Sequence, residues 1–391
     1  MLDEQFYMVA KTFQGLEEVL AQEIRGLGVT DIEILNRAVR FRGDLKVMYA
    51  ANYRLRTALK VLVEVDTFPA KTDFELYQGI QKIDWVRYLE PSMSMAVECV
   101  LFSDFFSHSQ FIAQRTKDAV VDQFRDRTGR RPSVDRDNPD LLISIHIQDA
   151  KVNVLLDSSG GSLHRRGYRS QMHLAPINEV LAAGLLLLSG WTGKGNLIDP
   201  MCGSGTFLIE GAMIAMNIPP GTFRSNFGFE KWKNFDQEIF TEVADQVEEN
   251  SDFKYRIVGS DKSAKSLQLA REGLHRAFLD KKIELVHEPL ESYVPPAGGG
   301  WLITNPPYDE RMKVDSITGL YRMIGDRMKQ YYKGYQVWIF SGNPDAMKFI
   351  GLHPSKKIPM LNGSIECSFR RYDIYEGSKK AKYQKPLIVK K

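Results

Sequence analysis

The stretch "NLIDPMCGSGTFLIEGA", residues 196–212, decides the fold of the larger part of this chain. Its first four residues are typical of a short buried strand that ends at Asp199. A loop with Gly203 and Gly205 follows, and an apolar helix begins directly after it. Glycines let the backbone approach a ligand closely, and the N-terminus of a helix offers N–H groups to an anion. The stretch therefore predicts a strand–loop–helix unit that binds a small charged molecule.

From about residue 175 onward, the sequence alternates between short apolar strands and amphipathic helices. Such alternation predicts an α/β fold, in which helices cover both faces of a parallel sheet. The expected strands cover residues 196–199, 256–261, 283–287, 301–305 and 335–342, with a last pair near 357–363 and 366–375. Open sheets of this kind bind ligands at the carboxyl ends of their strands, so we expect the functional residues at that edge.

The glycine loop fits S-adenosylmethionine better than a dinucleotide. Leu208 stands where the motif G-x-G-x-x-G has its third glycine, and no acidic residue ends a second strand about 20 residues further on. The carboxylate of S-adenosylmethionine can bind the loop N–H groups, its ammonium can face Asp199, and its ribose can bind Asp261. Glu288 can accept from the adenine amino group. The predicted cofactor-binding residues are Asp199, Met201, Cys202, Gly203, Ser204, Gly205, Thr206, Asp261 and Glu288.

The stretch "WLITNPPY", residues 301–308, ends the fourth strand with an amide, two prolines and an aromatic ring. An exocyclic amine of a purine is a poor nucleophile, so acceptors must hold both hydrogens and turn the nitrogen toward the methyl donor. Asn305 Oδ1 and the Pro306 carbonyl can be these acceptors, and Tyr308 can stack on the extruded base. The predicted catalytic residues are Asn305, Pro306, Pro307 and Tyr308. Alone, the same stretch could be a turn that closes a strand.

The composition is that of a soluble globular protein. The 391 residues predict two or three domains, and 43% hydrophobic with 26% charged residues is ordinary. A net charge of +3 permits a polyanionic partner without proving one. The N-terminus lacks the pattern of a signal peptide, and the longest apolar run, from Val180, is about half of the ~18 residues of a membrane span. We expect a cytoplasmic protein with no membrane contact.

Three cysteines, Cys99, Cys202 and Cys367, are far apart in the sequence and form no C-x-x-C pair. Neither a disulfide framework nor a zinc site is predicted, and we expect no bound metal. Some RNA methyltransferases attack pyrimidines with a cysteine. Cys202, however, lies inside the cofactor loop with no base suggested beside it, which disfavours a nucleophilic role.

The first 160 residues predict two smaller α+β units, with strands and helices in a layered arrangement. A long helix near 109–127 should bury a stripe made of Ile112, Thr116, Val120 and Phe124. Arg115, Lys117 and Arg125 lie off this stripe and could meet phosphates. A solvated helix face with intrahelical ion pairs is the favoured interpretation of the three cations.

The stretch "SSGGSLHRRGYRSQMH", residues 158–173, connects these units to the α/β part. It places Arg165, Arg166, Tyr168 and Arg169 together, and interleaved cations with an aromatic suit phosphate pairing and base stacking. We predict these four as RNA-binding residues. The alternative, equally favoured by the residues alone, is an ordered linker whose arginines bind carboxylates.

With both motifs present, the sequence resembles the THUMP-containing RNA methyltransferases, most closely the 23S rRNA guanine-N2 methyltransferases. The resemblance covers about residues 5 to 375 and follows the family order. It is carried by "SQFIAQRTKDAVVDQF", "RPSVDRDNPDL", "LHRRGYR", "APINEVLAA", "DPMCGSGTFLIEGAM", "FGFEKWKNFD", "VGSDKS" and "NPPYDERM". The chain also looks like the first half of a longer rRNA methyltransferase with two activities.

The resemblance implies an N-terminal ferredoxin-like segment at 1–65, a THUMP domain at 66–160, a linker at 161–174 and a Rossmann-like methyltransferase domain at 175–391. It implies methylation of the N2 amine of a guanosine, with 23S rRNA or a large-subunit precursor as the partner. Asp309 stands where close relatives have glycine, so a local turn could differ.

Three alternatives to this function stay open. A tRNA guanine-N2 methyltransferase would use the same site residues. A DNA adenine-N6 methyltransferase uses similar motifs, although the RNA-type N-terminal domains argue against it. A non-catalytic RNA-binding assembly factor could keep the fold without turnover. The sequence does not determine the oligomeric state or the role of the lysine-rich C-terminus.

Overall fold

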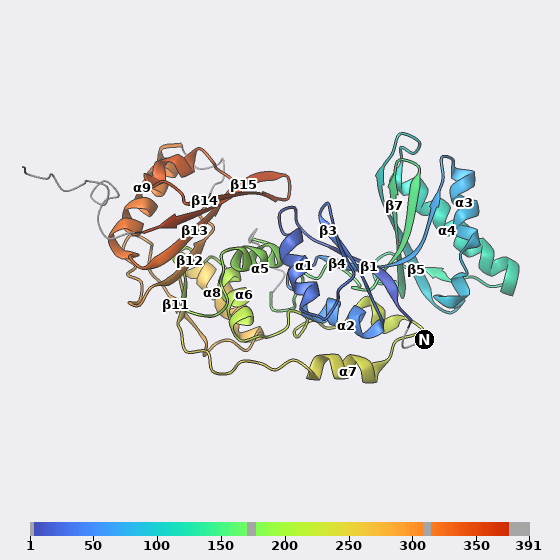
Figure 1. The fold of residues 1–391 in the computed structure, drawn as a ribbon, viewed down its shortest axis with the longest axis horizontal. Helices are drawn as coiled ribbons and strands as arrows, with labels where there is room; N and C mark the ends of the chain where they lie inside the picture. The colour runs from blue at the N-terminus through green and yellow to red at the C-terminus, as the bar shows by residue number, and fades with distance from the viewer. Residues whose placement is uncertain (1–3, 170–176, 308–313, 375–391) are drawn as a thin grey trace, which may run out of the picture. The chain divides into compact units, whose positions relative to one another are not determined.

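The computed structural model describes residues 4–169, 177–307 and 314–374 (Figure 1). Contacts divide the chain into two compact units. The first consists of Met1–Gly167 with Pro219–Glu248, and the second of Tyr168–Ile218 with Glu249–Lys391. The segment 219–248, which lies within the range predicted as the methyltransferase domain, thus packs with the N-terminal unit.

The first unit is built on an eight-stranded sheet in the order β2-β3-β1-β4-β8-β7-β5-β6. Its strands are β1 (Phe6–Lys11), β2 (Ile32–Leu35), β3 (Ala38–Gly43), β4 (Lys60–Pro69), β5 (Ser94–Phe102), β6 (Ser133–Val134), β7 (Leu141–Gln148) and β8 (Lys151–Asp157). Its helices are α1 (Glu17–Arg25), α2 (Leu45–Arg54), α3 (Asp73–Lys82) and α4 (Ser109–Thr128). Because β4 pairs with β8, the two predicted α+β units share one continuous sheet.

Helix α4 buries the predicted stripe, which consists of Ile112, Thr116, Val120 and Phe124. The three cations off the stripe all have carboxylate partners: Arg115 has Asp73, Lys117 has Asp118, and Arg125 has Asp122. These exposed or half-buried pairs favour the solvated-face interpretation over phosphate contacts. Each of them contributes little to stability.

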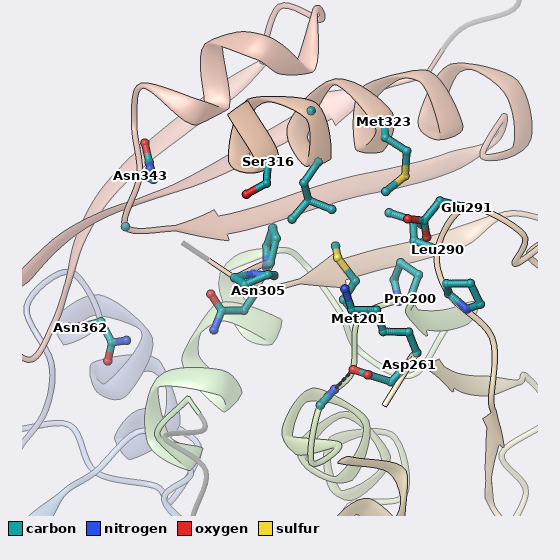
Figure 2. A pocket seen from close by; sticks show the side chains of 18 of the residues that line it. Pro200, Met201, Asp261, Leu290, Glu291, Asn305, Ser316, Met323, Asn343 and Asn362 are labelled. Atoms are coloured by element: carbon teal, nitrogen blue, oxygen red, sulfur yellow. Dashed lines mark hydrogen bonds between the residues drawn. The ribbon is translucent and has the colours of Figure 1, made fainter. Parts of the chain in front are cut away.

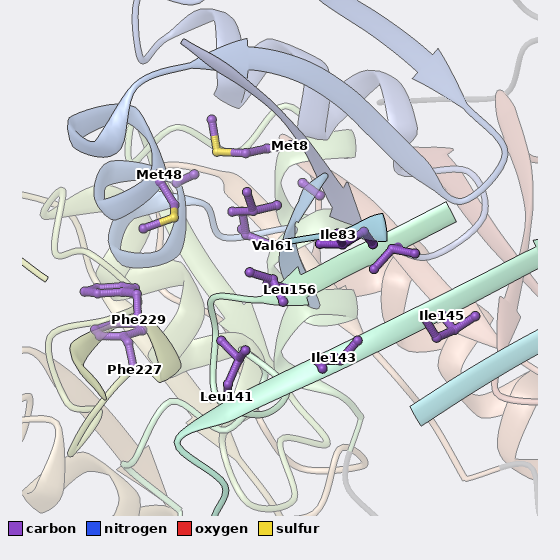
Figure 3. Close-up of a cluster of buried hydrophobic side chains, with 14 of the residues drawn as sticks. Met8, Met48, Val61, Ile83, Leu141, Ile143, Ile145, Leu156, Phe227 and Phe229 are labelled. Atoms are coloured by element: carbon purple, nitrogen blue, oxygen red, sulfur yellow. The ribbon is translucent and has the colours of Figure 1, made fainter. Parts of the chain in front are cut away.

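The segment 219–248 carries helix α7 (Gln237–Asp245) and an aromatic cluster that completes the core of the first unit. Phe227 and Phe229 stack with their ring centroids 5.2 Å apart, below Met48 of α2 in Figure 3. The ring of Phe229 lies 4.5 Å from that of Tyr49. Burial of several large aromatic rings explains why this segment associates with the first unit.

The second unit contains a seven-stranded sheet in the order β11-β10-β9-β12-β13-β15-β14. Its strands are β9 (Asn196–Asp199), β10 (Ile257–Ser260), β11 (Ile283–Val286), β12 (Gly300–Thr304), β13 (Tyr335–Ser341), β14 (Lys356–Asn362) and β15 (Ile365–Asp373). Its helices are α5 (Glu179–Leu188), α6 (Thr206–Ala215), α8 (Ala264–Arg276) and α9 (Val314–Tyr331). The first five strands in sheet order are parallel, and β15 runs antiparallel to both of its neighbours, β13 and β14. This arrangement confirms the predicted α/β fold.

Within the described ranges, no helix is long and apolar enough to cross a membrane. In the same part of the chain, no cluster of three or more His, Cys, Asp or Glu residues is placed to hold a metal ion.

Candidate active site

A cavity of about 1320 Å³ opens at the carboxyl edge of the parallel strands, where the predicted motifs converge (Figure 2). Its wall comes from the segments that follow β9, β10, β11, β12 and β13, from α9, and from β14 and β15. The wall residues include Met201, Gly203, Asp261, Lys262, Glu291, Asn305, Pro306 and Pro307. Ligand pockets commonly measure about 300–1,000 Å³, so this cavity has room for a cofactor and part of a second substrate.

The loop between β9 and α6 is the strand–loop–helix connection that the sequence predicted. Gly203 and Gly205 both have positive φ, at 55° and 78°. A side chain at Gly205 would also come within 3.3 Å of the Ala270 Cβ atom. Glycine is therefore required for the sharp turn that starts α6, and the N-cap of this helix has no side-chain hydrogen bond.

Asp261 joins the cofactor loop to the end of β10. Its Oδ2 accepts a 2.9 Å hydrogen bond from the Gly203 N–H, which the dashed line in Figure 2 marks. Its Oδ1 accepts from the Ser263 N–H at 2.8 Å, at the start of α8. Asp261 thus fixes the loop and lies on the cavity wall, where the predicted ribose contact requires it.

Asp199 lies behind the loop rather than on the cavity wall. It is buried, and its Oδ1 accepts from the Thr304 hydroxyl at 2.7 Å and from the Met201 N–H at 3.2 Å. Burial raises the pKa of Asp199 to about 7, against the opposing effect of the hydrogen bonds. A positively charged group placed next to this carboxyl would favour its ionised form.

The other predicted loop residues differ in accessibility. Met201 lies on the cavity wall, whereas Cys202 and Thr206 are buried. Burial raises the pKa of the Cys202 thiol well above its usual value, which argues against a nucleophilic thiolate. Ser204 Oγ is buried and has no hydrogen-bond partner within the described residues. Such an atom fits a ligand that supplies the missing partner.

Glu288 is exposed and is absent from the cavity wall, although it was predicted to bind the adenine amino group. Its backbone carbonyl accepts from the Ser260 hydroxyl. Glu291, slightly further along the chain, lies on the cavity wall with Leu290, and both are labelled in Figure 2. The geometry favours Glu291 for this contact, and no pattern in the sequence separates the two glutamates.

Asn305, Pro306 and Pro307 follow β12 and lie on the cavity wall. The Oδ1 atom of Asn305 is buried and has no hydrogen-bond partner among the described residues. A buried acceptor without a donor is costly, and a substrate N–H in the cavity would satisfy it. Tyr308, the fourth predicted catalytic residue, lies outside the described residues, as does Asp309.

The predicted RNA-binding residues of the linker have different environments. Arg165 is exposed. Arg166 is 2% exposed and donates to the carbonyls of Leu163 and Arg56. Tyr168 is 1% exposed.

Two of these residues bind carboxylates of the second unit. The Tyr168 hydroxyl donates to Glu210 at 3.0 Å, and Arg169 pairs with Glu179 at 2.9 Å. For Arg166, Tyr168 and Arg169, the geometry favours the ordered-linker interpretation over an RNA contact.

Family models match the chain along most of its length. The family model described as "RMKL-like, methyltransferase domain" matches residues 166–371. The chain belongs to the RMKL-like methyltransferases. An RlmL ferredoxin-like domain model matches residues 7–62, and a THUMP domain model matches residues 70–157. The expected family and fold are thereby confirmed.

Two relatives of this RMKL-like methyltransferase differ in length. A Synechocystis sp. protein, named as a candidate RNA methyltransferase, is 38% identical over 94% of this chain and 96% of its own. Ribosomal RNA large subunit methyltransferase K/L of Syntrophotalea carbinolica is 36% identical over 96% of this chain but 54% of its own. This chain therefore spans about half the length of the K/L enzyme.

Two solved structures share the fold with a TM-score of 0.86 each. SMU.472, described as a candidate methyltransferase and solved with S-adenosylhomocysteine, is 30% identical and covers 97% of this chain and all of its own. A Listeria monocytogenes protein, described as a predicted N6-adenine-specific DNA methylase, is 28% identical over 95% of this chain and 97% of its own.

This RMKL-like methyltransferase is an RNA methyltransferase that uses S-adenosylmethionine. The cofactor, when bound, supplies a methyl group activated on a sulfonium. The loop after β9 and the acid after β10 are the parts of this chain that would hold the cofactor, and the uncapped start of α6 suits its carboxylate.

Proposed function

We propose that this protein methylates the exocyclic N2 amine of a guanosine in 23S rRNA. The observation that carries the proposal is the Asn305 Oδ1 atom, a buried acceptor on the cavity wall without a partner in the described part of the chain. An exocyclic amine has two hydrogens to donate, and an amide oxygen together with the Pro306 carbonyl can accept both. The choice of large-subunit rRNA is supported by the name of the K/L relative. The choice of guanine N2 rests on the sequence resemblance described above.

The proposed chemistry needs orientation rather than strong base catalysis. Asn305 and Pro306 hold the amine so that its nitrogen lone pair faces the methyl group. An amide cannot act as a general base, so the amine proton leaves to water after the methyl group has transferred. Asp199, buried behind the loop, favours the cofactor ammonium through its negative charge, and Tyr308 stacks on the extruded base. A cytoplasmic location and binding of RNA by the N-terminal domains belong to the same proposal.

Nucleoside mass spectrometry tests this function directly. The protein is incubated with labelled S-adenosylmethionine and, separately, with 23S rRNA, 16S rRNA, tRNA and double-stranded DNA. We expect labelled N2-methylguanosine in the 23S pool alone. Labelled N2-methylguanosine in tRNA would show that tRNA, and not 23S rRNA, is the substrate. Labelled N6-methyladenine in DNA would overturn the proposal and favour the activity for which the Listeria protein is named. RNA binding without label in any pool would indicate the non-catalytic alternative.

A further inference from the structure

Arg169 makes contacts with the starts of two helices in the second unit. Its Nη1 lies 2.9 Å from Glu179 Oε1, and its Nη2 donates to the Ile177 carbonyl at 2.9 Å and to the Thr206 hydroxyl. Glu179 is the first residue of α5, and Thr206 is the first residue of α6. One guanidinium therefore ties together the N-termini of the two helices.

The helix α6 is the one that presents the cofactor loop. Thr206 directly follows Gly205, the positive-φ residue that ends the loop. The residue before Arg169 holds the same face of α6, because the Tyr168 hydroxyl donates to Glu210 at 3.0 Å and residues 206 and 210 are four apart. Two consecutive linker residues thus fix the first two turns of α6.

The contacts of Arg169 differ from those expected of a residue that binds RNA. Its side chain is 25% exposed, and that of its partner Glu179 is 5% exposed. A positive charge near two helix N-termini opposes the helix dipoles, and Glu179 compensates for it. Arginine is required because its planar group donates to three acceptors at once, whereas lysine is a point charge on a flexible stem. Arg169 is also absent from the cavity wall.

We propose that Arg169 is a positioning residue for S-adenosylmethionine binding, and that it acts through Thr206 and the start of α6. The N–H groups at this helix start and in the loop are the ones available to the carboxylate of the cofactor. Without the guanidinium contact, Thr206 and the loop lose a fixed position, and cofactor affinity falls. Affinity for RNA does not depend on this contact.

The variant Arg169→Lys tests the proposal because it keeps the charge next to the buried Glu179 and removes the three-way contact. Calorimetry with S-adenosylhomocysteine should show affinity about five- to tenfold weaker than in the native protein. In the methylation assay, KM for S-adenosylmethionine should rise by the same factor, while kcat at saturation stays within about twofold. Filter binding of a 23S rRNA transcript should change by less than about twofold. The exposed Arg276→Lys of α8 is the matched control.

A double-mutant cycle with Thr206→Val separates positioning from a general structural effect. If Arg169 acts through Thr206, the double variant should bind S-adenosylhomocysteine no more weakly, within about twofold, than the weaker of the two single variants. If the losses of S-adenosylhomocysteine affinity in the two single variants multiply in the double variant, the proposal is wrong. It is also wrong if Arg169→Lys loses RNA affinity but keeps native affinity for S-adenosylhomocysteine. Calorimetry needs no nucleic acid, so these results do not depend on whether the proposed guanine substrate is correct.

Discussion

The hydroxyl of Thr304 donates a 2.7 Å hydrogen bond to Oδ1 of Asp199, and both residues are almost fully buried. Thr304 ends β12 and directly precedes Asn305, whereas Asp199 ends β9 and directly precedes the cofactor loop. The two strands are parallel neighbours in the sheet. This single bond therefore connects the segment proposed to hold the target amine with the segment proposed to hold the cofactor.

The first prediction concerns the pH dependence of cofactor binding. The pKa of Asp199 is raised to about 7 by burial, and the Thr304 hydrogen bond lowers it. Thr304→Val should therefore raise the pKa further and leave less carboxylate at neutral pH. Because the cofactor ammonium prefers the ionised form, affinity for S-adenosylhomocysteine should rise with pH through about 7 in the native protein and at higher pH in the variant.

Calorimetry at several pH values between about 6 and 9 measures this shift. Thr304→Ser keeps the hydroxyl and should follow the native curve. Identical midpoints for Thr304→Val and the native protein would show that the hydrogen bond does not control the charge of Asp199.

The second prediction concerns the proposed acceptor of the target amine. Asn305→Ala should lower methyl transfer by about 100-fold or more, since removal of one well-placed polar group of an active site costs about that much. Affinity for S-adenosylhomocysteine should stay within a few-fold, because the loop contacts of the cofactor are untouched. Single-turnover methylation and calorimetry measure the two effects. Near-native turnover would remove Asn305 from the proposed role.

The third prediction separates the linker arginines. Arg165 is exposed, so Arg165→Ala should lower the salt slope of RNA binding by about 0.7 to 0.9 if it contacts one phosphate. Arg166 is buried and donates to two backbone carbonyls. Arg166→Ala should instead destabilise the protein by about 1–3 kcal/mol through unsatisfied acceptors. Filter binding at several salt concentrations and chemical denaturation measure these effects. An unchanged salt slope for Arg165→Ala would show that Arg165 contacts no phosphate, so that all the predicted RNA-binding arginines would belong to an ordered linker.

The fourth prediction distinguishes the two glutamates after β11. Glu291 lies on the cavity wall and Glu288 does not. Glu291→Gln should weaken S-adenosylhomocysteine binding several-fold, because a carboxylate accepts more strongly from the adenine amino group than an amide does. Glu288→Gln serves as the matched control and should bind as the native protein does. If Glu288→Gln instead binds more weakly than Glu291→Gln, the adenine contact belongs to Glu288, the residue predicted from the sequence.

Local patterns were sufficient for the main elements of the fold. The alternation of strands and helices predicted the parallel sheet, and β9 and α6 form the predicted strand–loop–helix unit. The short strands β2 and β6 and helix α7 were not predicted. Strand β2 is only four residues long and β6 two, so neither carries a clear period, and α7 depends on packing against aromatic rings of α2.

In the candidate site, too, the sequence predicted some features and missed others. Motifs placed Asn305, Gly203 and Asp261 at one edge because carboxyl ends of parallel strands meet there. No motif indicated that Asp199 would lie behind the loop against Thr304, since that contact joins residues 105 positions apart. The linker arginines were ambiguous for a similar reason: a guanidinium binds carboxylates and phosphates with the same geometry, and only the neighbours decide between them.

The sequence by itself predicted the class of fold, the glycine loop after β9 and the position of Asn305 after β12, because each depends on residue types at short spacing. Only the tertiary structure decided which charged side chains are buried and what they contact. Arg169 is the clearest case, since its partners Glu179 and Thr206 come from the starts of two different helices. Burial makes such contacts specific, because a desolvated charge must find partners, and only the acceptors that the packed helices bring within reach are available.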